Sequence, residues 1–597
     1  MVFATGPYHN AQQVHVSEIL SSMKPPKCDQ QKIANKFIVD LKMGNLHINR
    51  VMYLAGFGAI VFLIGLFFAT SGTDMMINAK IKKSLVLEEG SEGLKRFQKM
   101  PFPLEFKVFL FNITNPDDVM MGGKPVLTEV GPYTYDLFKE KPDLKFLSDG
   151  MIEYNMTYQF HFNPQKSRGS ESDVVTALNI PLLGTATMVE ETFPMGLGFL
   201  NNAIPFLFPN ITDIFVSVTV GDLLFKGTII QCNYTSGPAM PICNGLKGRA
   251  PPTIWREEDT KHFRFAMFRH KNKTSEGPYK VKTGKEDISE VGQIVEYQHR
   301  NKLKNWDKNS SCTIIRGTDT TIFGPPKNPH DDLYIFVPDV CLSFGASYVN
   351  TTIQHGIPLN KYYSAEKNMA SAARDPDNLC RCAKDDDGVR QCLKDGVIDA
   401  SPCQGAPVIV SNPHFLDADP EYRNGVVGLK PVEDKHKTFV LMEPRTGAPV
   451  EGRKRMQMNL KVKKINSITL LENVTERVIP LLWIEEGTRL EGPLLHDLQK
   501  LYHVMGLLAT FSWVLLAAGL VILAVSGVLY LKVRRLFCFS GTTLVTPVDS
   551  SGVGGQRMNT FGVTNQGADD YQEHAYPGAT IYPQLGGSQE KNGDVAR

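Results

Sequence analysis

Residues Val504–Leu531, VMGLLATFSWVLLAAGLVILAVSGVLYL, contain no charged side chain. About 20 apolar residues in a helix are enough to cross a hydrocarbon core of about 30 Å, so this stretch is long enough to span a bilayer. Three basic residues follow it directly, Lys532, Arg534 and Arg535. Because basic flanks usually stay in the cytoplasm, we expect the tail after Leu531 to be cytoplasmic.

A second uncharged run, Val51–Gly72, lies near the other end of the chain. Two spans with the last tail inside place the first tail inside as well, and everything between the spans outside. The predicted organisation is a cytoplasmic tail at 1–50, a transmembrane helix at 51–72, an ectodomain at 73–503, a transmembrane helix at 504–531 and a disordered cytoplasmic tail at 532–597.

The glycosylation sequons support this topology. Asn-x-Ser/Thr motifs are modified only in the secretory lumen, and all eight of them fall between the two spans. A single sequon is weak support because the pattern arises by chance, whereas eight on one side are strong support. The candidate N-glycosylation sites are Asn112, Asn155, Asn210, Asn233, Asn272, Asn309, Asn350 and Asn473.

Composition narrows the class of protein. The 597 residues carry a formal charge of +2 and show no basic cluster with interleaved aromatic residues, so we expect no nucleic-acid partner. Eight of the ten cysteines lie in the ectodomain, and an even number in an oxidising compartment indicates disulfides. Cys380, Cys382 and Cys392 are spaced like a metal cluster, but a lumenal location favours oxidation over zinc, so we expect no metal and no cofactor.

The ectodomain pattern is typical of strands. Runs of β-formers recur along the chain, and strands this scattered must pair over long distances, which favours one large antiparallel domain. We expect strands at Phe106–Asn112, Val126–Tyr135, Met151–Phe162, Ile314–Phe323, Tyr334–Val337, Pro407–Ser411, Phe439–Glu443, Met456–Lys463 and Val478–Ile484.

The segment from about residue 174 to 274 has a different pattern. Within it, Thr192–Ile211 is apolar and aromatic but is interrupted by Pro194, Pro205 and Pro209, too often for a clean membrane span. Such a stretch builds either core helices or an exposed apolar surface that captures a ligand or lines a lipid cavity.

Two features of the last tail suggest signals for protein trafficking. Cys538 lies a few residues past the membrane beside basic residues and is a candidate for S-palmitoylation. Tyr582 and Leu585 form a tyrosine-based pattern of the kind that clathrin adaptors bind, although a plain disordered tail explains them equally simply.

Several ordered motifs resemble the class B scavenger receptor family. The resemblance covers the ectodomain and both spans but not the two tails, which are longer than is usual in the family. Within the family the chain looks most like the insect sensory neuron membrane protein branch, through His270–Thr274, Thr283–Gly284 and Ile479–Gly487. The family motifs are Glu129–Tyr133, Asn179–Pro181, Cys312–Asp319, Tyr334–Ser343, Asp377–Cys382, Gly396–Cys403, Pro413–Phe415 and Gly447–Leu460.

The resemblance implies a fold and a disulfide pattern. The fold would be of the α+β class: a large antiparallel β-barrel ectodomain with an apical helical bundle at about residues 174–274 and an apolar tunnel, anchored by two transmembrane helices. The pattern pairs Cys312 with Cys380, Cys341 with Cys403 and Cys382 with Cys392. Cys232 and Cys243, outside the common family cysteines, would then pair with each other. The clustered cysteines also allow other pairings.

The resemblance also implies a function. The chain would be a plasma-membrane receptor that captures fatty acids, other lipids or lipid-derived pheromones and passes them to the bilayer or to a neighbouring odorant receptor, with an odorant-binding protein as a further partner. The alternatives are a scavenger or lysosomal protein-docking receptor in endosomal or lysosomal membranes and, from another class, a ligand-gated channel. We do not expect enzymatic activity, because the sequence contains no Gly-x-Ser-x-Gly hydrolase motif, no His-Glu-x-x-His zinc-protease motif and no P-loop. We interpret His414 and Asp319 as structural residues.

Overall fold

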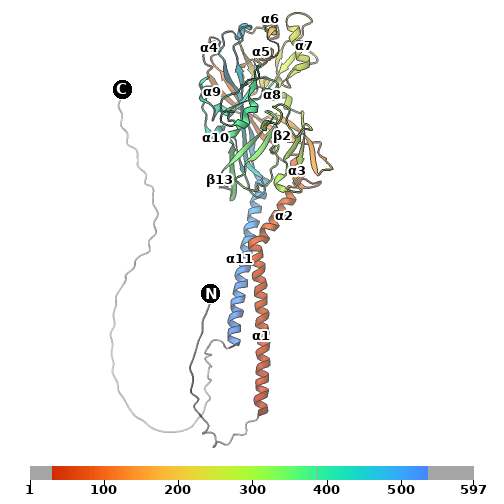
Figure 1. The fold of residues 1–597 in the computed structure, drawn as a ribbon, viewed down its shortest axis with the longest axis vertical. Coiled ribbons are helices and arrows are strands. Elements are labelled where there is room, and N and C mark those ends of the chain that lie inside the picture. The colour runs from red at the N-terminus through yellow and green to blue at the C-terminus, as the bar shows by residue number, and fades with distance from the viewer. Residues whose placement is uncertain (1–29, 386, 535–597) are drawn as a thin grey trace, which may run out of the picture. The chain divides into compact units, whose positions relative to one another are not determined.

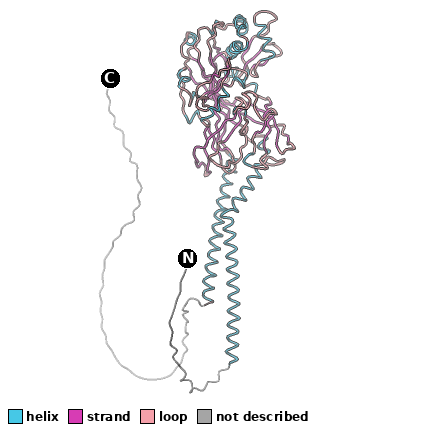
Figure 2. The backbone as a smooth tube through the Cα atoms, in the orientation of Figure 1, coloured by secondary structure: helices cyan, strands magenta, loops and turns pink. Residues whose placement is uncertain are grey.

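The computed structural model describes residues 30–385 and 387–534, with side chains described from residue 47 onward. Contacts divide the chain into two units, residues 1–533 and 534–597, and all but one of the described residues belong to the first. Figure 2 shows strands concentrated in the folded region of this unit and two long helices leaving it.

The centre of the fold is a large antiparallel sheet of 14 strands that curls into a nearly closed barrel, as predicted. Its main path runs in the order β11-β10-β4-β2-β1-β21-β20-β19-β14-β13-β12, with β3 and the pair β17 and β18 attached to its side. The strands are β1 Leu104–Ile113, β2 Leu127–Glu140, β3 Lys145–Phe146, β4 Met151–Phe162, β10 Ser275–Lys282, β11 Ile294–Tyr297, β12 Leu333–Val337, β13 Leu342–Gln354, β14 Ile357–Ser364, β17 Val397–Asp399, β18 Val408–Ser411, β19 Phe439–Met442, β20 Pro449–Val462 and β21 Arg477–Arg489.

Alternation of side chains explains why these segments form one barrel. Along most of β1, buried residues alternate with half-buried ones, because successive side chains of a strand point to opposite faces. β1 pairs with its sequence neighbour β2 on one side and with β21, the last strand, on the other. Phe109 and Trp483 stack face to face across the second pairing, with ring centroids 3.8 Å apart.

The two ends of the sheet are joined by a short irregular strip. The carbonyl of Gly317 accepts the N–H of Ile294 in β11, and the carbonyl of Thr318 accepts the N–H of Phe336 in β12. The sequence prediction of a strand at Ile314–Phe323 was therefore wrong. Gly317 has φ of +90°, and a Cβ there would lie 2.0 Å from the carbonyl oxygen of Tyr334, so only glycine fits this close approach.

Helices and short strands cover one end of the barrel (Figure 1). In residues 174–274 the structure forms three helices together with a two-stranded and a three-stranded sheet, so this part is less purely helical than the sequence suggested. These elements are β5 Val174–Leu178, α5 Ile180–Thr192, α6 Leu197–Leu207, β6 Phe215–Thr219, β7 Thr228–Ile230, α7 Ala239–Arg249, β8 Ile254–Arg256 and β9 Phe263–Phe265. The remaining short elements are α3 Glu92–Gln98, α4 Pro116–Met120, β15 Ala383–Lys384, β16 Arg390–Gln391, α8 Ser401–Gln404, α9 Pro420–Asn424 and α10 Glu433–His436.

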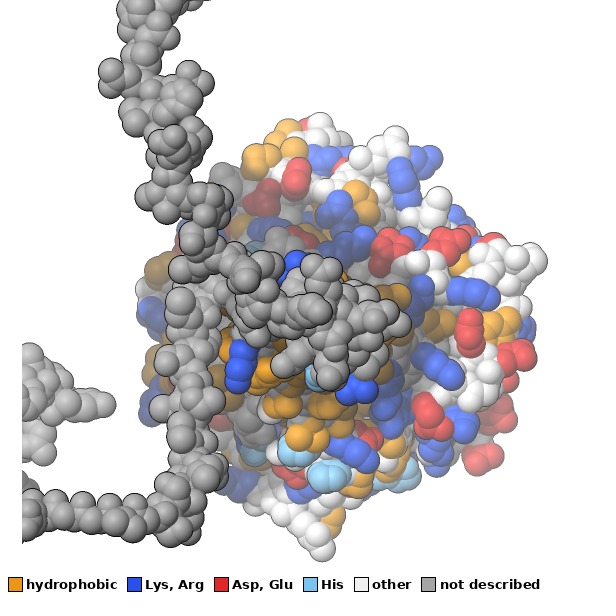
Figure 3. Space-filling view, turned by 90° about the horizontal axis from the view of Figure 1, so that it is seen from below, with side chains coloured by type: hydrophobic (Ala, Val, Ile, Leu, Met, Phe, Trp, Pro, Cys, Tyr) orange, Lys and Arg blue, Asp and Glu red, His pale blue; other side chains and the backbone are white. Residues whose placement is uncertain are grey.

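Two long helices extend from the opposite end (Figure 1). The first is α1 Gln30–Phe67, which continues through a π-helical turn, Phe68–Gly72, into α2 Thr73–Leu85. The second is α11 Gly492–Val533. His47–Leu85 and Gly492–Val533 are both long and apolar enough to cross a membrane. Seen along these helices, hydrophobic side chains gather near the centre, and charged side chains of both signs are spread over the surrounding face (Figure 3).

Small residues bring the two spans together. Gly58, Gly65 and Gly72 are buried at intervals of seven on one helix. In the part of α11 that forms the predicted span, the buried positions have the same interval and are Ser512, Gly519 and Ser526. A Cβ at Gly519 would lie 2.5 Å from the backbone nitrogen of Phe62, so the helices touch along this seam. A seven-residue interval is typical of helices that cross at about 20°.

Candidate functional site

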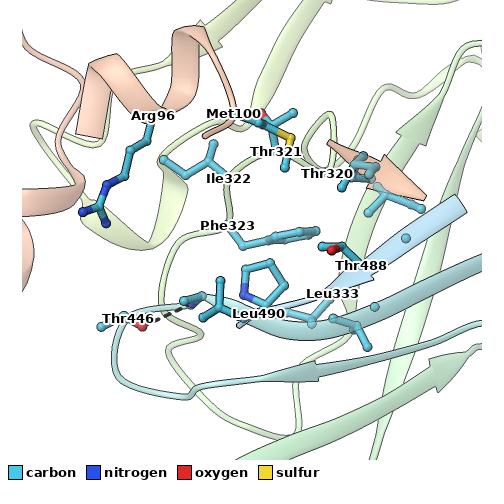
Figure 4. Close-up of a pocket in the computed structure, with 18 of the residues that line it drawn as sticks. Arg96, Met100, Thr320, Thr321, Ile322, Phe323, Leu333, Thr446, Thr488 and Leu490 are labelled. Atoms are coloured by element: carbon cyan, nitrogen blue, oxygen red, sulfur yellow. Dashed lines mark hydrogen bonds between the residues drawn. The ribbon is translucent and has the colours of Figure 1, made fainter. Parts of the chain in front are cut away.

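A cavity of about 580 Å³ lies at the end of the barrel from which the helices leave. Its walls come from strands β12, β13, β19, β20 and β21 and from the helices α2, α3 and α11. Phe323 and Ile322 project into this lower cavity, with Met100 on one side and Leu490 on the other (Figure 4). Leu494, Leu498 and Leu501 of α11 line it next to the predicted span.

A smaller cavity of about 130 Å³ lies farther along the barrel. It is lined by Phe106, Phe160, Met456 and Ile484 of the barrel. Ile180, at the start of α5, reaches it from residues 174–274, hereafter the apical part. This upper cavity and the lower cavity share three lining residues, Thr320, Lys454 and Glu486. We refer to these three residues as the partition.

Charged side chains continue from the partition along the wall of the upper cavity. The Glu486 carboxylate lies 2.5 Å from Lys139 Nζ and 3.0 Å from Lys454 Nζ. Lys271 Nζ lies 2.5 Å from Asp339 and 2.6 Å from Glu276. Lys454 also senses the charge of Asp339, which links the two groups. The result is a row of alternating charge, hereafter the ion-pair row: Glu276, Lys271, Asp339, Lys454, Glu486 and Lys139.

The pKa shifts of Glu486, Lys454 and Lys271 favour the charged form of each. Burial alone would raise the pKa of Glu486, but the charges of Lys139 and Lys454 outweigh burial and hold that pKa far below its usual range. Burial alone would lower the pKa of Lys454, and the charges of Glu486 and Asp339 raise it above its ordinary value. Lys271 behaves in the same way, since Asp339 and Glu276 raise its pKa despite burial.

Asp319 belongs to a separate buried pair. Its carboxylate lies 3.1 Å from Lys141 Nζ and accepts hydrogen bonds from the hydroxyls of Tyr154 and Thr321. Burial lowers the pKa of Lys141 to about 8 although Asp319 opposes the shift. The Lys141 ammonium also lies 3.8 Å from the ring centroid of Phe97. These contacts compensate the two buried charges inside the barrel.

Glu129, His414 and His436 come close enough to suggest a metal site, but their hydrogen bonds do not fit one. Nδ1 of His414 accepts the N–H of Lys430, and Nδ1 of His436 accepts the N–H of Val432. Each neutral ring therefore carries its proton on Nε2, and His414 Nε2 lies 2.6 Å from Glu129. A metal would need the nitrogen that this proton occupies, so the cluster is better explained as structural.

The stretch Thr192–Ile211 divides into two faces. Its buried face packs into the core through Leu197, Leu200, Ala203, Ile204 and Leu207 on α6. Its other face exposes four large apolar side chains at the end of the fold opposite the spans: Phe193, Met195, Phe199 and Phe206, of which Met195 is 82% exposed. The stretch thus forms core helix on one side and an exposed apolar surface on the other, and capture of a ligand by that surface stays a prediction.

Among the described residues, four disulfides lie between the two spans, and they join the pairs expected from the sequence: Cys232–Cys243, Cys312–Cys380, Cys341–Cys403 and Cys382–Cys392. The Cys341–Cys403 bond fastens the start of β13 to α8, next to the wall of the upper cavity. All of the sulfurs near Cys380 are thus in disulfides, which leaves none of them free to hold a metal.

The sequons differ in exposure. Asn210, Asn233, Asn309, Asn350 and Asn473 are exposed. Asn112, Asn155 and Asn272 are half-buried, and two of these three side chains accept backbone hydrogen bonds through Oδ1. Cys538, Tyr582 and Leu585 lie outside the described residues.

No member of the ion-pair row was assigned a role from the sequence, although Lys271, Asp339, Lys454 and Glu486 lie within the motifs that carry the family resemblance. A signal was present in Glu485-Glu486 of β21, because consecutive residues of a strand point to opposite faces and one of two adjacent charges must point inward. Glu485 pairs with Lys107 and Arg455 and lines neither cavity, whereas Glu486 lines both.

Comparison with known proteins gives a consistent result. The model of the CD36 family matches residues 55–530. Sensory neuron membrane protein 2 of Manduca sexta is 34% identical over 478 residues, which cover 79% of this chain and 92% of the relative. Sensory neuron membrane protein 1 of Plutella xylostella is 32% identical over 78% of this chain and 88% of its own length. The corresponding protein of Apis mellifera is 30% identical over 80% and 90%.

Proposed function

The chain belongs to the CD36 family, and from this premise we propose that it is a double-pass membrane receptor that captures lipid-like ligands and conducts them through its barrel. The ligands would be fatty acids, other lipids or lipid-derived pheromones. They would enter near the exposed apolar side chains of the apical part and leave at the bilayer or at a neighbouring odorant receptor. An odorant-binding protein would be a suitable donor.

The observation that carries this proposal is the pair of cavities. The upper cavity touches α5 of the apical part, the lower cavity touches α11 just before its membrane span, and the two share the partition. Burial of each CH₂ group of a lipid contributes about 0.8 kcal/mol, so apolar walls along this path lower the cost of crossing the aqueous layer. Such transport requires neither a cofactor nor a chemical step.

The proposed orientation follows from the flanking charges and the sequons. The ectodomain at 73–503 would lie outside the cell, and the tails at 1–50 and 532–597 would lie in the cytoplasm. The plasma membrane is the location that suits a receptor for external ligands. Palmitoylation at Cys538 and sorting through Tyr582 and Leu585 would regulate how much of the protein resides there.

The proposal is tested by titrating the full-length protein in nanodiscs with a fluorescent C16 lipid. We expect saturable binding with about one site per chain, displaced by competitors in proportion to the length of their alkyl chains. Binding that never saturates and equals the uptake of empty nanodiscs would overturn the proposal.

The exposed apolar residues of the apical part favour a second candidate, a receptor that docks another protein. Phe193, Met195 and Phe199 are each more than half exposed, and exposed apolar groups of this kind often mark interfaces. If lipid binding fails in the nanodisc experiment, replacement of these residues by serine should abolish the uptake of a cargo protein. This role fits an endosomal or lysosomal membrane.

A further inference from the structure

The partition lies where a lipid would have to cross from one cavity to the other. We infer that the ion-pair row makes this crossing selective: uncharged lipids with a hydrogen-bonding head group pass, and carboxylates of the same chain length are held back. The inference rests on the proposed conduit and narrows the ligands proposed for it: uncharged lipids would be conducted, and ionised fatty acids would not cross the partition.

The charges of the ion-pair row balance one another. The row contains three ammonium groups and three carboxylates, so its net charge is zero. Every lysine in it already faces a carboxylate of the protein at 3.0 Å or less. No positive charge of the row is left to pair with an entering carboxylate. Transfer of an unpaired ion out of water costs several kcal/mol.

The row also has hydrogen-bond donors. An ammonium group has three N–H donors, and the lysines of the row each make one or two ion-pair contacts among the described residues. N–H groups therefore remain for the oxygen of an ester, aldehyde or alcohol. Such a head group can stay hydrogen-bonded at the partition without disturbing the balance of charge.

The partition contrasts with the walls on either side. The upper cavity presents Phe336, Met456 and Ile484 near the crossing, and the lower cavity presents Phe323 and Ile335. These side chains are apolar on both sides and contact the alkyl chain of either lipid, so the walls do not distinguish an ester from an acid. The discrimination has to come from Lys454, Glu486 and the charges that adjoin them.

The test uses full-length protein in nanodiscs and two photoreactive probes, a C16 alkyl acetate and a C16 carboxylic acid, each with a diazirine at the far end of its chain. The probes are supplied from the bilayer, and albumin in the aqueous phase removes any probe that escapes. After illumination, mass spectrometry compares labelling of an upper-cavity peptide, Phe336–Val340, with a lower-cavity peptide, Gly447–Pro449. The upper-to-lower ratio reports passage across the partition.

In the unmodified protein we expect this ratio to be at least tenfold higher for the acetate than for the acid. Glu486→Gln removes one negative charge and leaves Lys139 and Lys454 with spare positive charge, so the ratio for the acid should rise about tenfold while that for the acetate stays constant. Glu485→Gln is the matched control, because it makes the same change one residue away on the opposite face of β21 and should leave both ratios unchanged.

Equal ratios for acetate and acid in the unmodified protein would overturn the inference, even if Glu486→Gln does not fold. An acid ratio that Glu486→Gln leaves unchanged would overturn it as well. In either case, labelling of both cavities would still support the conduit. Absence of labelling in both cavities would overturn the conduit and the inference together.

Discussion

Lys141 and Asp319 show how the barrel tolerates charge in its core. Each is almost completely buried, and each is the other's counterion. Because burial lowers the pKa of Lys141 to about 8, the pair is near the limit at which the lysine would give up its proton. A buried pair of this kind costs most when one partner is removed and the other remains.

We therefore predict that Asp319→Asn lowers the free energy of unfolding by about 3–5 kcal/mol, because it strands the Lys141 ammonium in the core. The double variant Lys141→Met and Asp319→Leu should recover part of this loss. Denaturant unfolding of the purified protein measures both. Glu92→Gln breaks an exposed pair with Lys95 and should cost less than about 1 kcal/mol. Single and double variants with equal losses would contradict the prediction.

His436 and His270 predict a dependence of stability on pH. Burial is the main cause that lowers the pKa of each to about 4. A histidine in the unfolded chain has a pKa of about 6.5. Between pH 6.5 and 4 these histidines are therefore protonated in the unfolded chain and neutral in the folded protein. The stability that these histidines contribute is thus complete above pH 6.5 and decreases as the pH falls.

Unfolding at pH 5.0 should therefore require on the order of 1 kcal/mol less per histidine than unfolding at pH 7.5. His436→Asn keeps an acceptor for the N–H of Val432 and should reduce the difference between the two pH values. Equal free energies of unfolding for the unmodified protein at both pH values would disprove this assignment.

At the scale of elements, the seam between the spans depends on residues without bulky side chains. A leucine at Gly519 would meet the backbone of Phe62. A Cβ added at Gly527, on the same helix, would meet no atom within 4 Å outside its own helix backbone and chain neighbours. Overpacking of the kind expected at Gly519 costs typically about 1–3 kcal/mol.

We predict that Gly519→Leu separates the spans and that Gly527→Leu does not. A disulfide between Gly58→Cys and Ile522→Cys reports the seam, because the Cβ of residue 58 would lie 3.1 Å from that of Ile522. Its yield should fall severalfold with Gly519→Leu and stay constant with Gly527→Leu. Equal yields in the two backgrounds would show that the seam does not hold the spans together.

Most strands could be predicted from the sequence because their signal is local. Alternation and β-branched residues are sufficient for Met151–Phe162, whose predicted bounds equal those of β4. Ile314–Phe323 is also rich in β-branched residues, but Gly317 and Thr320 adopt positive φ there, and the segment bridges the sheet ends instead of entering the sheet. The ion-pair row could not be predicted as a unit, because its members come from five separated parts of the chain: Lys139, Lys271 with Glu276, Asp339, Lys454 and Glu486.

At the scale of the whole molecule, the proposed conduit requires free volume next to the membrane. Thr488→Trp fills part of the lower cavity and should reduce the transfer of a fluorescent C16 ester into the bilayer at least fivefold. Thr260→Trp, at an exposed position of the apical part, is the control and should transfer normally. Unimpaired transfer by Thr488→Trp would show that lipids do not pass through this cavity.

Because β1 pairs with β21, the barrel cannot close until almost the whole chain has been synthesised. Phe109 faces Trp483, roughly 370 residues later, and a ribosome that adds about 5–20 residues per second needs on the order of 20–70 s to supply the partner. Throughout that interval the edge of β1 that pairs with β21 lacks its partner strand. In the finished fold Asn112 is half-buried and its Oδ1 accepts the N–H of Thr176. A sugar on Asn112 would therefore mark chains that were modified before Thr176 formed this contact.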